Sequence, residues 1–292
     1  MATGARGGPI AVVDVGSNSV RLVVYDRLSR APVSRFNERR LCGLGREVAR
    51  SGTLGTDGKA YTMEALRRFA AIARAMGCRR IDIVAPAAIR NARDGAAFVA
   101  EAEAALGLPI AVLSGAEEAR CGAQGVVCGF GAVEGVMGDL GGGSVELAAL
   151  GRSGGAADGG PLAVSLPLGV LQLVELMRAD SEIVHRRIEE ARAGLPAQAA
   201  AARGRAFFVV GGSWRALARA RMAMTDHPLR VVHGYELTPA EAETLGRTMG
   251  RMDPRELARL PGVPRRRAEL IPAAGVLLAH IVRRLEPDRV VF

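Results

Sequence analysis

The sequence predicts a mixed α/β protein made of two similar domains that face each other across a cleft. Short β-branched runs alternate with segments of helical periodicity along the chain, a pattern typical of α/β architecture. A nonapeptide, DVGSNSVRL, begins at Asp14 and returns in similar form, DLGGGSVEL, at Asp139. A repeat at nearly half the chain length indicates a duplicated domain. The 292 residues suffice for two domains of roughly 100–200 residues each.

The elements of the first half follow from local pattern. Residues 10–15 and 21–25 are β-branched runs around the turn GSNS, which predicts a hairpin. Residues 44–59 are rich in glycine and polar side chains, which favours a loop. Beyond them we expect a helix over 62–76, a strand over 81–85, a helix over 94–106 and a strand over 110–113.

The second half repeats the pattern. Residues 133–150 form two apolar runs around GGGS, which predicts a second hairpin, and apolar residues resume at Leu162. Further along we expect a helix over 181–202, a strand over 207–210, a helix from Trp214, and helices over 238–252 and 266–285.

Composition excludes several classes of protein. No apolar run reaches the 18 residues of a membrane span, and the first ten residues lack the apolar core of a signal peptide. The four cysteines show no CxxC spacing, so we expect reduced thiols and a cytoplasmic location. The net charge is +9, and all the Lys and Arg residues except Lys59 are arginines. The excess of positive charge favours a polyanionic partner. An arginine-rich proteome would explain the ratio of Arg to Lys, but it does not explain this excess.

The two repeated loops have the composition of phosphate sites. In each, an aspartate, Asp14 or Asp139, ends an apolar run and a Gly/Ser turn follows. Consecutive N–H groups in such a turn can bind an anion. The aspartate would repel phosphate unless a divalent cation lay between them, and Mg²⁺ suits oxygen ligands. The alternative is that both loops are ordinary tight turns.

Two glutamates, Glu118 ahead of the second loop and Glu146 within the second repeat, are candidates for acid–base chemistry. Ser114 and Glu117 have capping-box spacing at the start of a helix, which leaves Glu118 free to act as a general base or merely to complement the helix dipole. Glu146 occupies the position of Arg21 in the first copy. It could hold metal or water, or be a plain strand residue.

Weaker signals complete the candidate site. Gly211 and Gly212 follow a strand and open a helix, whose N-terminus suits an anion. Arg90 also follows a strand and could hold phosphate, or be a solvated helix residue. His233 and His280 have no ligand spacing and are expected to be structural. The chain lacks GxSxG and GxxxxGK[ST], which disfavours serine hydrolases and Walker-type ATPases.

These motifs together resemble a known family. VVDVGSNSVRLVVYD, VAPAAIRNARDG, LSGAEEAR, GDLGGGSVEL and VVGGSWRALAR are similar to conserved stretches of the exopolyphosphatase/guanosine pentaphosphate phosphohydrolase family, within the actin-like, sugar-kinase and heat-shock ATPase superfamily. The resemblance implies two ribonuclease-H-like domains, placed at residues 1–124 and 125–292.

The resemblance also implies roles for single residues. Glu118 matches the general base, and Glu146 the glutamate that supports metal or water. Asp14 and Asp139 match magnesium-associated aspartates, with Mn²⁺ able to replace Mg²⁺. The phosphate-binding positions are matched by Ser17, Asn18, Arg90, Gly141, Gly142, Gly143 and Ser144.

The expected activity is Mg²⁺-dependent release of the terminal phosphate of inorganic polyphosphate. Guanosine pentaphosphate presents the same terminal phosphoanhydride and remains open as the substrate. An ATP-dependent sugar kinase and a non-catalytic phosphate sensor are the alternatives from other classes. We expect no membrane partner and no sequence-specific nucleic-acid partner, and the sequence leaves a homodimer open.

Overall fold

The fold consists of two compact units, each built around one β-sheet. The computed structural model describes residues 7–29, 31–151, 163–192 and 195–292. The units are Met1–Ser114 and Gly115–Phe292; the predicted division between residues 124 and 125 falls inside a helix, Gly115–Phe130. No helix among the described residues is both long and apolar enough to cross a membrane.

The first unit has a five-stranded sheet with strand order β3-β2-β1-β4-β5. Strands β1, β2 and β3 pair antiparallel, and β4 and β5 continue the sheet parallel to β1. Its elements are β1 (Ile10–Val15), β2 (Ser19–Tyr25), β3 (Ser34–Leu41), α1 (Leu44–Ser51), α2 (Thr56–Ala75), β4 (Arg80–Ala85), α3 (Ala87–Asn91), α4 (Gly95–Leu106) and β5 (Ile110–Val112).

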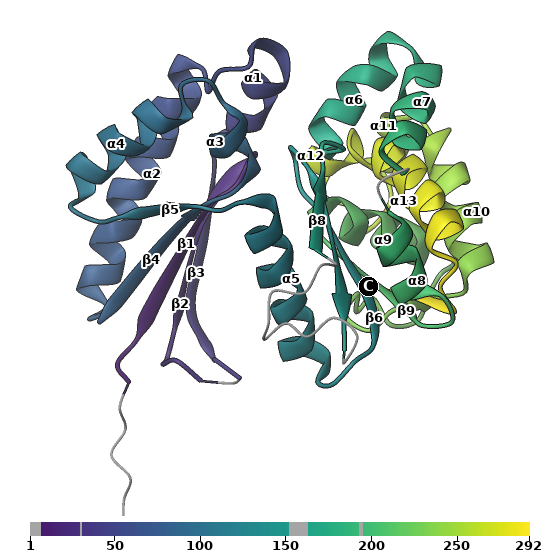
Figure 1. Cartoon of the computed structure of the whole chain (residues 1–292), viewed down its shortest axis with the longest axis horizontal. Coiled ribbons are helices and arrows are strands. Elements are labelled where there is room, and N and C mark those ends of the chain that lie inside the picture. Colours follow the sequence, from purple (N-terminus) through teal and green to yellow (C-terminus); the bar gives the residue numbers. More distant parts are fainter. Residues whose placement is uncertain (1–6, 30, 152–162, 193–194) are drawn as a thin grey trace, which may run out of the picture. The chain divides into compact units, whose positions relative to one another are not determined.

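The core of the first unit lies on one face of this sheet. Alternate residues of β1 and β2 are buried there, as period-two patterning requires. They form one cluster with apolar side chains of α2 and α4, the helices that lie beside this sheet in Figure 1. Asp14 points to the opposite face and is exposed. The sheet therefore presents Asp14 away from the apolar core.

The second unit has a six-stranded sheet with order β10-β11-β9-β6-β7-β8. Its helices and strands are α5 (Gly115–Phe130), β6 (Gly135–Leu140), β7 (Val145–Leu150), β8 (Ala163–Leu166), α6 (Val170–Ala179), α7 (Ser181–Arg192), α8 (Pro196–Ala202), β9 (Ala206–Val210), α9 (Gly212–Met224), β10 (Glu236–Leu237), α10 (Pro239–Gly250), α11 (Pro254–Leu257), α12 (Arg265–Ala268), α13 (Ile271–Leu285) and β11 (Arg289–Val291).

The two sheets share one topology, which confirms the two-domain α/β fold predicted from the repeat. In the second unit β8-β7-β6 are antiparallel and β9 and β11 continue parallel to β6, as β3-β2-β1-β4-β5 do in the first. This is the ribonuclease-H-like strand order. Strand β10 is an addition to the second sheet, at its outer edge.

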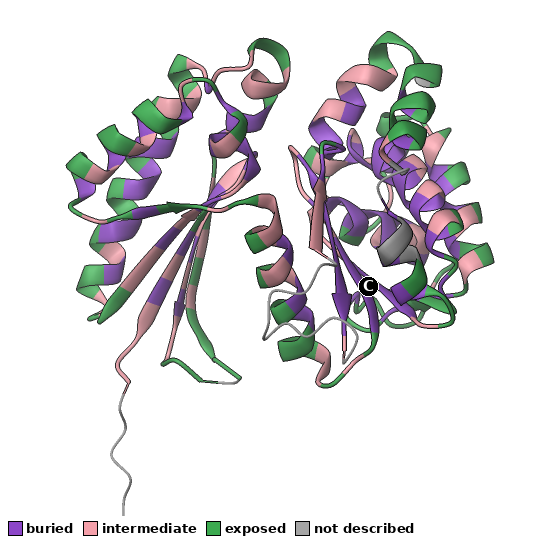
Figure 2. Cartoon of the chain, viewed as in Figure 1, coloured by how far each residue is buried: buried purple, intermediate pink, exposed green. Residues whose placement is uncertain are grey.

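Both faces of the second sheet are covered. Residues of β6 and β7 are nearly all buried, as Figure 2 shows. One face packs on α5 through Ala119, Ala123 and Val126, and the other contributes to a larger cluster with α6, α9, α10 and α13. A polar side chain on the inner strands is thereby removed from water.

Some predicted elements were wrong or missing. Residues 44–59 were expected to be a loop, but α1 lies there between Gly43 and Gly52, with φ values of 69° and 75°; it forms because Leu44 and Val48 pack on the core. Strand β3 is polar and largely exposed, so only its backbone pairing with β2 defines it. The helix expected over 266–285 is divided into α12 and α13.

A pair of glycines sets the spacing of α10 and α13. A Cβ on Gly275 would lie 2.8 Å from the Gly246 oxygen and 3.2 Å from the Met249 Cβ. We expect Gly275→Ala to lower the free energy of unfolding by about 1–3 kcal/mol, the cost of overpacking. The matched change Gly125→Ala, in exposed α5 with no neighbour within 4 Å among the described residues, should raise it by about 0.5–1 kcal/mol. Denaturant unfolding of both variants measures this, and equal effects would contradict the close packing.

Candidate active site

A row of polar side chains crosses three strands of the second sheet. Asp139 on β6 pairs with Glu146 on β7, and Glu146 pairs with Ser165 on β8. Directly paired residues share a face of the sheet, and this face is the one that α5 covers. The Ser165 hydroxyl donates to Glu146 Oε1 at 2.7 Å, so the Glu146 carboxyl is held in place although only 1% of the residue is exposed.

Helix α5 brings a third carboxylate to this row. It begins at Gly115, as the sequence predicted, and Gly115 lies so close to Ser165 that a Cβ there would collide with that side chain. In the first turns of α5, Glu117 is exposed and Glu118 is half-buried. The charge of Glu118 acts on Glu146. The structure therefore brings together the two predicted catalytic glutamates and separates Glu118 from Glu117.

The site concentrates negative charge in a poorly hydrated place. Burial raises the pKa of Glu146 to about 8, and the charges of Glu118 and Asp139 add to this effect, while the Ser144 and Ser165 hydroxyls oppose it. Burial also raises the pKa of Asp139, which the positive charge of Arg215 counteracts. The buried Ser144 hydroxyl has no hydrogen-bond partner among the described residues, although it lies near enough to Glu146 to stabilise the charged form.

The start of α6 holds the turn between β6 and β7 in place through backbone hydrogen bonds. The N–H groups of Val170 and Leu171 donate to the carbonyls of Gly141 and Gly142 at 3.0 and 3.1 Å. A Cβ on Gly169 would collide with the turn backbone, so glycine is required there. The N–H of Gly141 donates to the Ser144 carbonyl at 3.0 Å. Because α6 occupies carbonyl oxygens of the turn, the amide groups of Gly142, Gly143 and Ser144 are the part of the turn suited to an anion.

The second glycine pair lies against the same strand end. Gly211 has a φ of 103°, and a Cβ on it would lie 2.5 Å from the Leu140 oxygen and 3.0 Å from Asp139 Oδ1. The Arg267 guanidinium rests on Gly212. Gly211 and Gly212 thus flank the row of carboxyls, with Arg215 and Arg267 as the nearby cations.

The repeated loop of the first unit has the same construction. Asp14 pairs with Arg21 across the hairpin, where the second unit has Asp139 and Glu146. The carbonyls of Ser17 and Asn18 accept N–H groups from the segment that enters α1, namely those of Cys42, Gly43 and Gly45. Ser17 is buried.

Arg90 lies in α3 of the first unit. It is half-buried, and its Nη1 donates to the Leu113 carbonyl at 2.6 Å. The side chain is therefore held by the backbone at the end of β5, unlike a solvated helix arginine.

The donors of the second unit suit a hard cation. Asp139, Glu146, Ser144 and Ser165 offer only oxygen atoms, which Mg²⁺ prefers. The pKa values of both carboxyls are raised, and burial is the first cause. Within the described ranges, no three His, Cys, Asp or Glu side chains cluster closely enough to hold a metal by themselves. Mg²⁺ usually keeps several waters and binds through one or two carboxylates with substrate phosphates.

Sequence reasoning missed three residues of this site. Ser165, Arg215 and Arg267 carry no motif of their own, and strand β8 is too short to reveal its register. Arg215 follows GGS in the first turn of α9, where an anion-binding helix start could have drawn attention to it. Arg267 reaches Gly212 from α12 through tertiary packing alone.

An α/β fold with paired Gly/Ser turns and buried carboxyls is that of a phosphate-processing enzyme. The sequence profile of the Ppx/GppA phosphatase family matches residues 23–292, and the chain therefore belongs to this family of phosphoanhydride hydrolases.

Solved structures of family members share the fold. A Ppx/GppA phosphatase from Aquifex aeolicus is 24% identical, with a TM-score of 0.72 over 97% of this chain and 94% of that one. An exopolyphosphatase from Cytophaga hutchinsonii is 19% identical, with a TM-score of 0.82 over 97% of this chain and 92% of that one. The fold is thus conserved at low sequence identity.

The buried Glu146 carboxyl predicts a pH-dependent stability. Its pKa is about 8 in the folded chain against an ordinary value of 4.5, so folding favours the protonated form. That stability is present below about pH 4.5 and is lost as the pH rises through 8. Without added metal, the melting temperature of the wild type should fall by roughly 5–10 °C relative to Glu146→Gln between pH 5 and pH 8. Parallel curves for the two proteins would contradict the buried proton, and the exposed Glu190→Gln serves as control.

Proposed function

We propose that this protein is an exopolyphosphatase that hydrolyses the terminal phosphoanhydride of inorganic polyphosphate and releases phosphate. The observation that carries the proposal is the coupling of Glu118 to the buried Glu146 beside the Gly141–Ser144 turn. Family membership supports hydrolysis of a phosphoanhydride, and a structural relative is named as an exopolyphosphatase.

The turns and arginines bind the substrate in this proposal. The amide groups of Gly142, Gly143 and Ser144 face the terminal phosphate, and Gly211 and Gly212 receive the next one at the start of α9. In the first unit, Ser17 and Asn18 supply the equivalent turn and Arg90 a bidentate donor. The arginine-rich surface, with a net charge of +9, attracts the polyanion.

Asp139 and Glu146 are the residues of the second unit proposed to hold Mg²⁺, and Asp14 is the corresponding candidate of the first unit. Mn²⁺ would suit the same oxygen ligands. When bound, the ion offsets the charge of the phosphates and polarises them for attack. Ser165 orients the Glu146 carboxyl through its 2.7 Å hydrogen bond.

Glu118 is the proposed general base. It accepts a proton from the water that attacks the terminal phosphorus. Glu118 is well suited to this because it is half-buried at the start of a helix, whereas Glu117 is exposed. Most of the rate gain comes from positioning and charge stabilisation, as is usual for phosphoryl transfer.

Phosphate release from polyphosphate, guanosine pentaphosphate and ATP with sugars tests the substrate. We expect polyphosphate to be cleaved fastest with Mg²⁺, and activity to vanish with excess chelator and return with Mg²⁺ or Mn²⁺. Faster release from guanosine pentaphosphate would change the substrate, phosphorylation of a sugar would replace hydrolysis, and full activity in chelator would refute the role of the metal.

The two adjacent glutamates give the sharpest test of the catalytic assignment. Glu118→Gln keeps the size of the side chain but cannot take a proton, so turnover should fall by roughly 10²–10⁴ while polyphosphate affinity and melting temperature persist. Glu117→Gln should retain turnover and lose about 0.5–2 kcal/mol of stability if its capping box forms. Turnover, polyphosphate affinity and melting temperature are measured for both variants. An inactive Glu117→Gln together with an active Glu118→Gln would assign the general base to Glu117 instead.

A further inference from the structure

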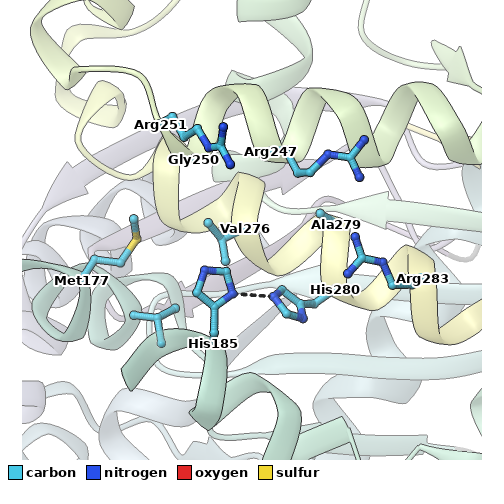
Figure 3. A pocket seen from close by; sticks show the side chains of 10 residues that line it. Met177, His185, Arg247, Gly250, Arg251, Val276, Ala279, His280 and Arg283 are labelled. Carbon is cyan, nitrogen blue, oxygen red and sulfur yellow. Dashed lines mark hydrogen bonds between the residues drawn. The ribbon is translucent and has the colours of Figure 1, made fainter. Parts of the chain in front are cut away.

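The second unit contains a cavity of about 450 Å³ that none of the predicted site residues line. It lies among α6, α7, α10 and α13 (Figure 3). One part of its wall is apolar and is formed by Met177, Val184 and Val276. The other part carries cations and imidazoles, so the cavity is amphipathic.

Three arginines line this cavity and no acidic side chain does, among the residues described. Arg247 and Arg283 share a single carboxylate, Glu243, at 3.4 and 3.2 Å. The Arg251 side chain forms no ion pair with any described residue. The arginines therefore exceed the negative charge that faces them, which favours an anion in the cavity.

Two histidines at the wall form a relay that ends on a carboxylate. His280 Nδ1 lies 2.9 Å from Glu189 Oε1, and His280 Nε2 lies 2.8 Å from His185 Nδ1, the contact drawn in Figure 3. Because the Glu189 carboxylate can only accept, His280 carries its proton on Nδ1 and accepts from His185 on Nε2. The second nitrogen of His185, Nε2, is left as an acceptor.

The direction of the pKa shift of His280 agrees with these donor and acceptor roles. Burial lowers the pKa of His280, with His185 and Arg283 adding to the effect, while the hydrogen bond to Glu189 opposes it. A neutral His280 preserves the direction of the hydrogen bonds. The cavity then offers arginine donors together with an imidazole acceptor.

We propose that this cavity is a second ligand site and that it binds a small phosphomonoester. The planar guanidinium groups match phosphate oxygens. With a second pKa of about 6, roughly a tenth of a phosphomonoester keeps a hydroxyl at pH 7, and this form can donate to His185. A carboxylate has no such proton at neutral pH. The apolar wall takes the organic part of the ligand, and because the ligand has no phosphoanhydride, it is not a substrate of the proposed hydrolase.

Histidine NMR gives a local test, since the chain has four histidines. Phenyl phosphate is the probe, with benzoate as the matched carboxylate. We expect phenyl phosphate to shift the imidazole signals of His185 and His280 and to leave those of His227 and His233 in place. Benzoate should bind at least about fivefold more weakly, which corresponds to roughly 1 kcal/mol.

Matched arginine variants assign the effect to the cavity. Arg251→Gln should weaken phenyl phosphate binding on the order of tenfold, as for loss of one charge-assisted hydrogen bond. Arg255→Gln removes the same charge at an exposed position outside the cavity and should change it little. Unmoved His185 and His280 signals at about 10 mM probe, equal losses in the two variants, or equal binding of benzoate would each overturn the proposal. Glu118→Gln should bind the probe like wild type, so this test is independent of the catalytic assignment.

Discussion

The contact between the β6–β7 turn and the start of α6 is the constraint on which the candidate site depends. Two N–H groups of α6 hold the carbonyls of Gly141 and Gly142, and Gly169 permits the approach because no side chain fits there. Helix starts carry unsatisfied N–H groups, so the turn satisfies them while its own amides turn the other way. The entry to α1 does the same for Ser17 and Asn18 in the first unit. Both copies therefore use one device to orient a strand-to-strand turn, although the two turns differ in sequence.

Close to the β6–β7 turn, the fold buries carboxyl groups that would carry negative charge in water. Glu146 lies on the inner β7 strand between Asp139 and Ser165, and α5 covers that face and adds Glu118. Buried carboxyls without sufficient partners become protonated rather than remain charged, which explains the raised pKa values of Glu146 and Asp139. Arg215, which acts on Asp139, and Arg267, which lies at Gly212, are cations close to these carboxyls.

The elements that were predicted correctly from the sequence are those determined by residues close to them in the chain. The hairpins around GSNS and GGGS, the strand before Gly211 and the helix start at Gly115 were correct because turn residues and apolar runs determine them nearby. Strand β3 and helix α1 were missed because pairing with β2 and packing of Leu44 override their polar composition. Ser165 and Arg267 reach the site only through sheet register and packing. Cross-strand pairs and helix contacts of this kind produce no local sequence motif. Side chains that reach the site through tertiary structure therefore cannot be predicted from motifs alone.

The difference between the two copies shows how a duplicated hairpin can divide its roles. At equivalent places opposite the conserved aspartate, the first unit has Arg21 and the second has Glu146. Arg21 donates to Asn37 at 3.0 Å and lies on a sheet face with partial exposure, whereas Glu146 is buried beneath α5. Asp14 faces the Arg21 side of its hairpin, whereas Asp139 faces a buried glutamate, and the positive charge that counteracts its raised pKa comes from Arg215 of α9. The backbone device that holds the turn could remain the same in both units because it uses carbonyls and helix N–H groups and no side chain.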